Sequence, residues 1–387
     1  MNPYKHKARD LKMIDKNLDC EQNKALNLKE SLKNLKVLKS RPVRISLNLT
    51  GKCNIRCIYC HLTYADYFSE NEFSATDFNK INWALRKTSH LVYFSSTEPL
   101  SAKHFKEIFI NSKKYKTEKY LSTNGIQITD EIAQLFVKEK LNFLTVSFGG
   151  LTEETFIKAH KVNKLKEVLE KIALINNYKK KYNTLYPKLR LVLVVMKSNA
   201  HELPLAVKIA KKYKFSEGLK ITYLKAYHKN LIKELPFNNK EYVQNYVREA
   251  QELGRRIGVK VNFDGGNFDD TEIDKNAIHH RKCLEPWQRL HIEANGDVHV
   301  CPSPRNKEIA GNIKKEKISK IWNGDVYQKF RRRVNSEDPP EVCKRCTHNF
   351  HKVFSRPDIW NQTDVNLGVY KRKKESAIEK ILKKYQK

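Results

Sequence analysis

Short apolar segments alternate with amphipathic segments along the first two thirds of the chain. The apolar segments are rich in Val, Ile and Tyr, which is typical of strands buried on both faces. Strands are predicted at 43–50, 91–96, 119–123, 143–148, 189–196 and 219–224. Helices are predicted at 76–87, 102–112, 131–139, 153–175, 201–213 and 239–257. Six repeats of strand then helix predict an α/β fold with a parallel sheet, either open or curved towards a barrel.

The alternation of strands and helices ends near residue 260. Asn295-Gly296 lies between two short apolar runs at 290–293 and 297–301, which predicts a β-hairpin. Four parts are therefore predicted: a basic helical extension over 1–42, an α/β domain over 43–260, a smaller hairpin-containing domain over 261–350, and a basic tail with an amphipathic helix over 351–387.

The charge of the chain is strongly positive, with 75 Lys and Arg against 43 Asp and Glu and a formal net charge of +32 over 387 residues. Such a field attracts nucleotides, anionic lipids and nucleic acid. Lysines are scattered over nearly every predicted helix, so we favour a compositional bias over a dedicated nucleic-acid footprint. Because the sequence has neither a membrane-length apolar run nor an apolar signal-peptide core, we expect a cytoplasmic protein.

Seven of the eight cysteines form two groups with ligand-like spacing, and Cys20 stands apart. Cys53, Cys57 and Cys60 form a CxxxCxxC loop directly after the first predicted strand. Three thiolates on a cuboidal iron–sulfur cluster leave one iron with an open position, which is typical of a chemically active metal. Zinc is the alternative, but zinc pairs are usually spaced more closely, and His61 is poorly placed as a fourth ligand.

The CxxxCxxC loop, with Tyr59 just before its last cysteine, resembles the signature of the radical S-adenosylmethionine (radical SAM) superfamily. The resemblance implies a partial, six-unit (β/α)6 TIM-like barrel with a smaller iron–sulfur domain at its C-terminus. It implies a catalytic 4Fe–4S cluster on Cys53, Cys57 and Cys60, with S-adenosylmethionine bound to the open iron. It also implies reductive cleavage of S-adenosylmethionine to a 5′-deoxyadenosyl radical, which abstracts hydrogen from a substrate.

Other strand ends resemble segments of this family that contact S-adenosylmethionine. Ser96-Thr97-Glu98-Pro99 resembles the Gly-Gly-Glu-Pro segment at the methionine amino group, with Ser96 and Thr97 replacing the glycines. A helical arginine of related enzymes has no clear counterpart, although His160 lies nearby. The resemblance implies a cofactor-binding set of Tyr59, Ser96, Thr97, Glu98, Ser122, Asn124 and Ser147.

The second group consists of Cys283 and Cys301, which flank the predicted hairpin, and the CxxC pair Cys343 and Cys346. Four thiolates give full ligation, which suits an electron-carrying or structural centre, and zinc is a real alternative at this site. The surrounding segments resemble the SPASM or twitch extensions of radical SAM enzymes. Four cysteines in place of the usual seven imply a single auxiliary 4Fe–4S cluster.

The resemblance implies a radical SAM enzyme whose auxiliary cluster takes an electron from the substrate. Such an enzyme needs an electron donor such as flavodoxin or ferredoxin, and we expect a small, anionic or carbohydrate-like substrate. Two alternatives remain: a peptide- or protein-modifying maturase, and a non-catalytic protein that binds RNA or an anionic surface. Residues 1–42 are short for a leader-binding domain, which disfavours the maturase. No catalytic acid or base can be assigned.

Overall fold

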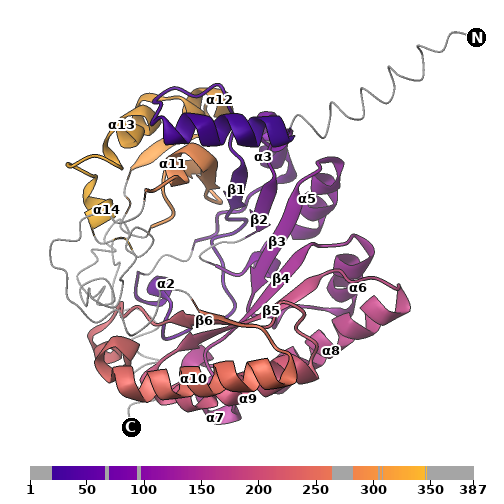
Figure 1. Cartoon of the computed structure of the whole chain (residues 1–387). Helices are drawn as coiled ribbons and strands as arrows, with labels where there is room; N and C mark the ends of the chain where they lie inside the picture. Colours follow the sequence, from indigo (N-terminus) through magenta and orange to yellow (C-terminus); the bar gives the residue numbers. More distant parts are fainter. Residues whose placement is uncertain are drawn as a thin grey trace, which may run out of the picture.

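One continuous ten-stranded sheet organises the computed structural model, which describes residues 20–65, 69–93, 97–263, 282–303, 306, 308–344 and 346. The strands are β1 Arg44–Leu47, β2 His90–Tyr93, β3 Glu118–Thr123, β4 Phe143–Phe148, β5 Lys188–Val195, β6 Leu219–Tyr223, β7 Val261–Phe263, β8 Arg289–Ile292, β9 Asp297–His299 and β10 Ile309–Asn312. Their order is β10-β9-β8-β1-β2-β3-β4-β5-β6-β7, and β1 to β7 are parallel. The sheet is curved and its order is linear, so it forms the predicted partial barrel (Figure 1).

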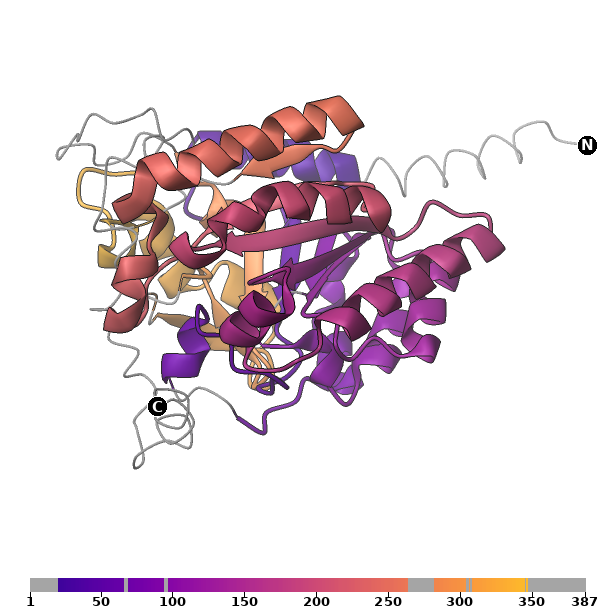
Figure 2. The same ribbon diagram turned by 90° about the horizontal axis from the view of Figure 1, so that it is seen from below.

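Helices cover the outer face of this sheet, where the strands present fully buried apolar side chains such as Leu91, Leu144 and Leu193 (Figure 2). The α-helices after β1 are α2 His61–Ala65, α3 Ala75–Lys80, α4 Asn82–Leu85, α5 Phe105–Asn111, α6 Asp130–Lys138, α7 Glu153–His160, α8 Leu165–Lys181, α9 Leu203–Lys212, α10 Lys240–Ile257, α11 Glu285–Gln288, α12 Ile318–Trp322, α13 Asp325–Arg333 and α14 Glu341–Lys344. The six predicted strands are thus confirmed, helices connect them as predicted, and the three-residue strand β7 is an addition.

Two predicted helices are broken. The helix predicted over 153–175 is two helices, α7 and α8, because Lys161 adopts a left-handed conformation with φ of 64° that a helix cannot continue. The helix predicted over 76–87 is likewise divided into α3 and α4 at Ile81. The first break has a consequence for the site, since it ends α7 at His160, beside the first cysteine loop.

The predicted hairpin forms and extends the barrel sheet. His291 on β8 lies opposite His299 on β9, and Gly296 in the turn has φ of +93°, which favours glycine. β8 also pairs in parallel with β1, with Ile45 opposite Leu290. The region after residue 282 is therefore joined to the barrel by a backbone ladder.

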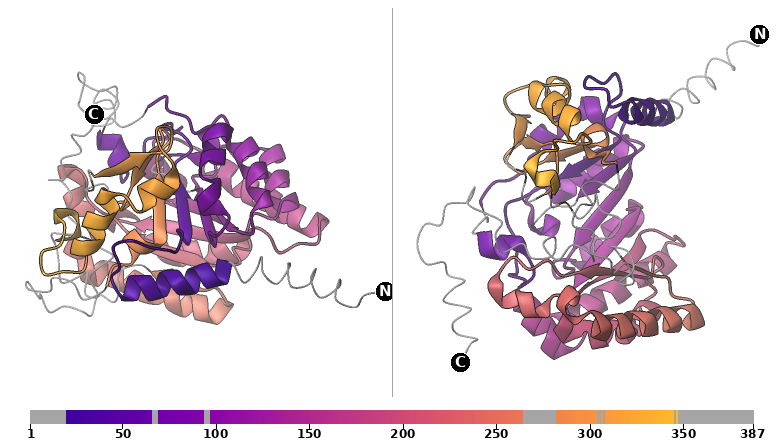
Figure 3. Two further views of the ribbon diagram at one scale, coloured as in Figure 1. Left: turned by 90° about the horizontal axis from the view of Figure 1, so that it is seen from above. Right: turned by 60° about the vertical axis from the view of Figure 1, so that its left-hand side comes forward.

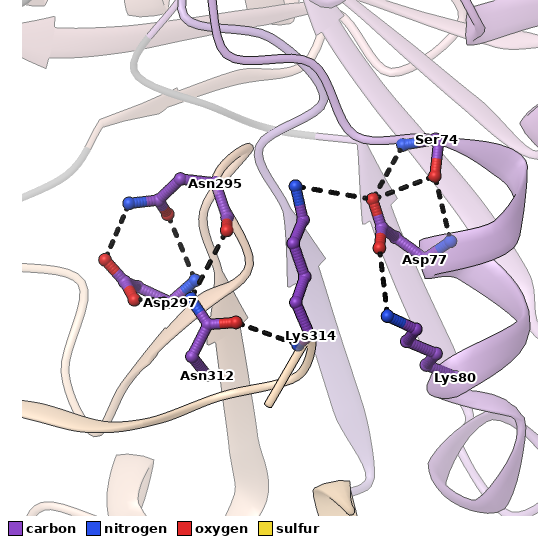
Figure 4. Close-up of polar contacts among 7 residues, drawn as sticks. All are labelled: Ser74, Asp77, Lys80, Asn295, Asp297, Asn312 and Lys314. Carbon is purple, nitrogen blue, oxygen red and sulfur yellow. Dashed lines mark hydrogen bonds and ion pairs between the residues drawn. The ribbon is translucent and has the colours of Figure 1, made fainter. Parts of the chain in front are cut away.

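Polar contacts fix the far end of this hairpin region (Figure 4). The Asn312 amide donates to Asp297 Oδ1 at 2.8 Å, which joins β10 to β9. Lys314 Nζ lies 3.7 Å from Asp77 Oδ2 on α3. Asp77 in turn accepts from Ser74 in the capping box of α3, so the C-terminal region is also linked to a helix of the barrel.

A helix over residues 20–32 lies beside α12 and α13 (Figures 1 and 3). Leu28 and Leu32 on this helix are exposed, and residues 1–19 of the predicted extension lie outside the described residues. Its buried side chains are polar instead: Asn27 donates to the Trp287 carbonyl at 2.5 Å, and Glu30 accepts from Ser40. Among the described residues, no helix is long and apolar enough to cross a membrane. The predicted tail over 351–387 lies outside the described residues.

Candidate functional site

The first cysteine loop begins just after β1, at the carboxyl edge of the parallel strands, where ligand sites of such sheets lie. Cys53, Cys57 and Cys60 are half-buried. The loop is held by its own contacts, since Arg56 donates to the Cys53 carbonyl at 2.7 Å and the Thr63 hydroxyl donates to the Cys57 carbonyl at 2.8 Å. These bonds fix the backbone from which the three thiols project.

The three thiols lie close enough to perturb one another. Burial raises the pKa of Cys53 to about 11, and the charge of Cys60 adds to this rise. Burial and the charges of Cys60 and Cys53 also hold the pKa of Cys57 well above its usual range. Buried thiols that disfavour ionisation need a positive centre before they can act as thiolate ligands, and iron ions supply one. The donor set therefore fits an iron–sulfur cluster.

His160, at the end of α7, is packed against this loop with 1% of its surface exposed. Its Nδ1 lies 3.2 Å from Cys57 Sγ. Its Nε2 lies 3.4 Å from the Tyr59 hydroxyl and accepts the Gly149 N–H at 2.8 Å. Burial lowers the pKa of His160 to about 3. Sequence reasoning placed His160 only in the neighbourhood of the site, because its contact with Cys57 spans 103 residues.

Glu98, which follows β2, is 2% exposed and lies beside the cysteine loop. Its backbone N–H donates to the Lys52 carbonyl at 3.2 Å. Its carboxylate accepts from the Thr123 hydroxyl at 2.6 Å and from the Asn124 N–H at 2.8 Å. Burial raises the pKa of Glu98 to about 6, although these hydrogen bonds oppose the rise.

The other residues of the predicted cofactor-binding set come from neighbouring strand ends. Thr97 donates to the Thr50 carbonyl at 2.7 Å, and Asn124 donates to Asn54 in the cysteine loop at 2.8 Å. Ser122 and Ser147 are half-buried on the same face of β3 and β4; Ser122 lies opposite Thr145, two positions before Ser147. Ser96 lies outside the described residues. The described members of the set thus gather around one edge of the sheet.

The second cysteine group assembles from three elements of the C-terminal region. Cys283 precedes α11, Cys301 follows β9, and Cys343 and Cys346 lie in and after α14. Burial raises the pKa of Cys283 to about 12, with an added contribution from the charge of Cys346. The pKa of Cys301 is raised by burial first and then by the charges of the other three cysteines. All four thiols are therefore close to one another.

The inner face of the sheet, which we define as the face turned away from the outer helices, carries polar side chains that sequence reasoning missed. The composition predicted strands that are buried on both faces, and this prediction is wrong for the inner face. Arg44 on β1, His90 on β2 and Arg190 on β5 are half-buried there. In an ordinary barrel these positions hold bulky apolar residues. Burial and then the positive charge of Arg44 lower the pKa of His90, while Glu118, 3.5 Å from its Nε2, opposes this shift. The period-2 alternation of polar residues was the available signal.

Models of known protein families match both regions that carry a cysteine group. Residues 47–190 match the family model of the radical SAM superfamily, and residues 283–347 match that of the SPASM iron–sulfur cluster-binding domain. A probable GTP 3′,8-cyclase of Thermococcus kodakarensis is 29% identical over 134 residues, which are 34% of this chain and 43% of that protein. The Fe-coproporphyrin III synthase of Methanosarcina barkeri is 29% identical over 107 residues, 27% of each chain. The chain thus spans less than half the length of these two relatives.

Solved structures share the fold over more of the chain. SuiB of Streptococcus suis, bound to S-adenosylmethionine, superposes with a TM-score of 0.61 at 15% identity and covers 87% of this chain and 79% of its own. The anSMEcpe protein with bound S-adenosylmethionine gives a TM-score of 0.56 at 16% identity, over 75% of this chain and 83% of its own. At such identities the likeness concerns the fold.

Proposed function

Since the chain belongs to the radical SAM superfamily and carries a SPASM iron–sulfur region, we propose that this enzyme removes a hydrogen atom from a small, negatively charged substrate. The family supplies the cofactors, a 4Fe–4S cluster with S-adenosylmethionine and auxiliary iron–sulfur. When bound, these groups provide an electron and a 5′-deoxyadenosyl radical. The residues of this chain bind and orient them and select the substrate.

Each residue of the first site has a role in this proposal. Cys53, Cys57 and Cys60 hold the catalytic cluster and leave one iron open. Glu98 accepts from the amino group of S-adenosylmethionine, and Thr97 positions Glu98 through its bond to Thr50. The strand-end residues Ser122, Asn124 and Ser147 bind the ribose, and Tyr59, within the cysteine loop, packs against His160.

The four cysteines of the second site would hold one auxiliary cluster, which would supply an acceptor for an electron from the substrate. Full ligation supports this role, since a cluster without an open iron transfers electrons rather than binding substrate. Cys301→Ala should therefore leave the cleavage of S-adenosylmethionine intact and abolish net oxidation of the substrate. A flavodoxin or ferredoxin in a reducing cytoplasm supplies the first electron.

The basic inner face is the observation that carries the substrate class. Arg44, Arg190 and Arg289 project from β1, β5 and β8, beneath the strand ends that hold the cofactor residues. Glu217 lies 3.4 Å from Arg190, Glu285 lies 3.2 Å from Arg289 and Glu118 lies 3.5 Å from the neighbouring His90, so an anionic substrate would compete with these carboxylates for the guanidinium groups. A guanidinium binds carboxylates and phosphates through paired hydrogen bonds. The matched GTP 3′,8-cyclases act on such a polyanion, GTP.

Anaerobic reconstitution followed by reduction tests the enzymatic half of the proposal. We expect about eight irons per chain, from two four-iron clusters, and 5′-deoxyadenosine as a product of S-adenosylmethionine. An iron-loaded protein that forms no 5′-deoxyadenosine contradicts the proposal and favours the non-catalytic, anion-binding alternative.

The substrate class is tested by calorimetric titration of the reconstituted protein with GTP, a polyanion, and guanosine, its neutral core. We expect GTP to bind and guanosine to bind at least about tenfold more weakly, as befits a charge-assisted contact of about 1.5–3 kcal/mol. Arg190→Gln should weaken the binding of GTP, whereas Lys208→Gln, which removes the same charge from the exposed surface of α9, should not. Equal losses in the two variants would show that the net charge alone attracts the nucleotide.

A peptide-modifying maturase is the second candidate, favoured by the fold. SuiB bound to its precursor peptide SuiA superposes over 89% of this chain, with a TM-score of 0.61. A maturase should form 5′-deoxyadenosine faster when its precursor peptide is added, and small anions should not change the rate. Testing peptides encoded beside the gene of this chain distinguishes the two candidates.

A further inference from the structure

His160 occupies a fixed position between two elements of the site. Asn199 donates to the Gly149 carbonyl at 2.8 Å and so anchors the loop after β4, and Gly149 N–H donates to His160 Nε2 at the same distance. The Phe156 ring packs on the imidazole with centroids 4.3 Å apart. The Ile58 N–H donates to the Ala159 carbonyl at 2.9 Å, which ties the cysteine loop to the end of α7.

The bond from Gly149 determines which nitrogen of His160 carries hydrogen. A backbone N–H can only donate, so Nε2 must be the unprotonated, accepting nitrogen. The imidazole is then neutral, and its hydrogen is on Nδ1. Nδ1 lies 3.2 Å from Cys57 Sγ, so it donates an N–H···S hydrogen bond to that sulfur.

We propose that His160 is a positioning residue that donates a hydrogen bond to the Cys57 ligand sulfur and thereby raises the reduction potential of the catalytic cluster. This inference rests on the cluster assigned to the loop in the proposed function. A donor to a ligand sulfur stabilises the reduced cluster more than the oxidised one, because reduction adds negative charge that is shared by the sulfurs. Hydrogen bonding to sulfur is one of the main protein controls on cluster potential.

The test compares two variants that differ only in the donor. His160→Leu removes both the acceptor for Gly149 and the donor to Cys57. His160→Asn also loses the bond to Gly149, but its amide nitrogen lies near the position of Nδ1 and can donate to the sulfur. Any effect of an unsatisfied Gly149 N–H is therefore common to both variants.

The measurement is a redox titration of the reconstituted full chain, followed by electron paramagnetic resonance. S-adenosylmethionine identifies the catalytic centre by perturbing its signal, and the auxiliary centre serves as an internal reference. We expect His160→Leu to lower the ratio of reduced to oxidised catalytic cluster about tenfold at a fixed potential, which is about 59 mV for a one-electron couple. His160→Asn should recover most of this shift, and the auxiliary centre should not change in either variant.

A second measurement needs no substitution. In wild-type protein labelled with 15N only at histidine, the reduced catalytic centre should show a weakly coupled 15N nucleus in pulsed spectra, arising from Nδ1. Absence of this coupling, or equal potentials in wild type and His160→Leu, overturns the role of His160 and leaves the proposed function intact. A wild-type centre whose signal S-adenosylmethionine does not perturb overturns the proposed function as well.

Discussion

Among single residues, Glu98 offers the most direct test of the cofactor site. Burial raises its pKa to about 6, so its carboxyl group loses its negative charge as the pH falls through that value. A protonated carboxyl attracts an ammonium group much less strongly. We therefore expect the affinity for S-adenosylmethionine to fall below about pH 6 and to level off about tenfold lower, which is the loss of one charged hydrogen bond.

The control for this prediction is Glu98→Gln, which cannot ionise; its amide oxygen can still accept from Thr123, whereas its amide nitrogen cannot accept from the Asn124 N–H. Its affinity at pH 8 should be about tenfold lower than that of the wild type, within the range of a charged hydrogen bond. The affinity of Glu98→Gln for S-adenosylmethionine should also stay constant between pH 5 and 8. Equilibrium dialysis with labelled S-adenosylmethionine measures both. A Gln variant with the same pH profile as the wild type would assign the titration to another group.

Residues of the site differed in how far the sequence revealed them. Cys53, Cys57 and Cys60 could be predicted because a cluster loop places its ligands a few positions apart. Glu98 could be found because it ends a strand, and the ends of parallel strands meet at one edge. His160 could not be assigned a contact, because its bond to Cys57 depends on where α7 stops.

Among the elements, α13 owes its position to a buried cation. Arg331 on α13 is 1% exposed and donates to the carbonyls of Pro286, Trp322 and Lys36 at 2.8–2.9 Å. Its guanidinium carbon also lies 4.6 Å from the centroid of the Trp322 ring. One side chain thus holds together α11, α12, α13 and the segment that follows the first helix.

Removing this cation should destabilise the C-terminal region. We expect Arg331→Met to lower the free energy of unfolding by about 3 kcal/mol or more, because three buried carbonyls lose a charged donor. Arg332→Met, on the exposed side of the same helix, should change it by no more than about 0.5 kcal/mol. Urea denaturation measures both free energies of unfolding, and their dependence on urea concentration should be the same in the wild type and the variants. Similar losses in the two variants would contradict the structural role of Arg331.

The strands were easier to predict from the sequence than the helix boundaries. The strands were predictable because each is a short apolar run rich in Val, Ile or Tyr that lies between amphipathic segments. The break at Lys161 was not, because a lysine in a left-handed conformation leaves no composition signal of the kind that glycine leaves. The helix over 20–32 buries Asn27 and Glu30 rather than its leucines, since polar contacts to Trp287 and Ser40 decide which side faces inward.

For the whole molecule, the continuity of the sheet joins the two cysteine groups. The strands β1 and β8 run side by side, and further backbone bonds extend the ladder: Val43 N–H donates to the Gln288 carbonyl and Asn48 N–H to the Ile292 carbonyl. The first cysteine loop follows β1, while Cys283 precedes α11 and β8. No local pattern could predict this pairing, because its strands are more than 240 residues apart.

The ladder predicts that the two regions unfold together. In hydrogen exchange of the full chain, amides of β1 and β8 should open with the same free energy and respond equally to urea, because neither strand can leave the other without exposing backbone groups. A chain ending at residue 263 should not form a stable monomer, since β1, which carries the buried Ile45 and Leu47, would become an exposed edge strand. Size-exclusion chromatography should show aggregates or an unfolded chain. A monomeric fragment with protected β1 amides would instead mean that the barrel stands without its extension, and the two clusters would then have to be positioned by side-chain contacts alone.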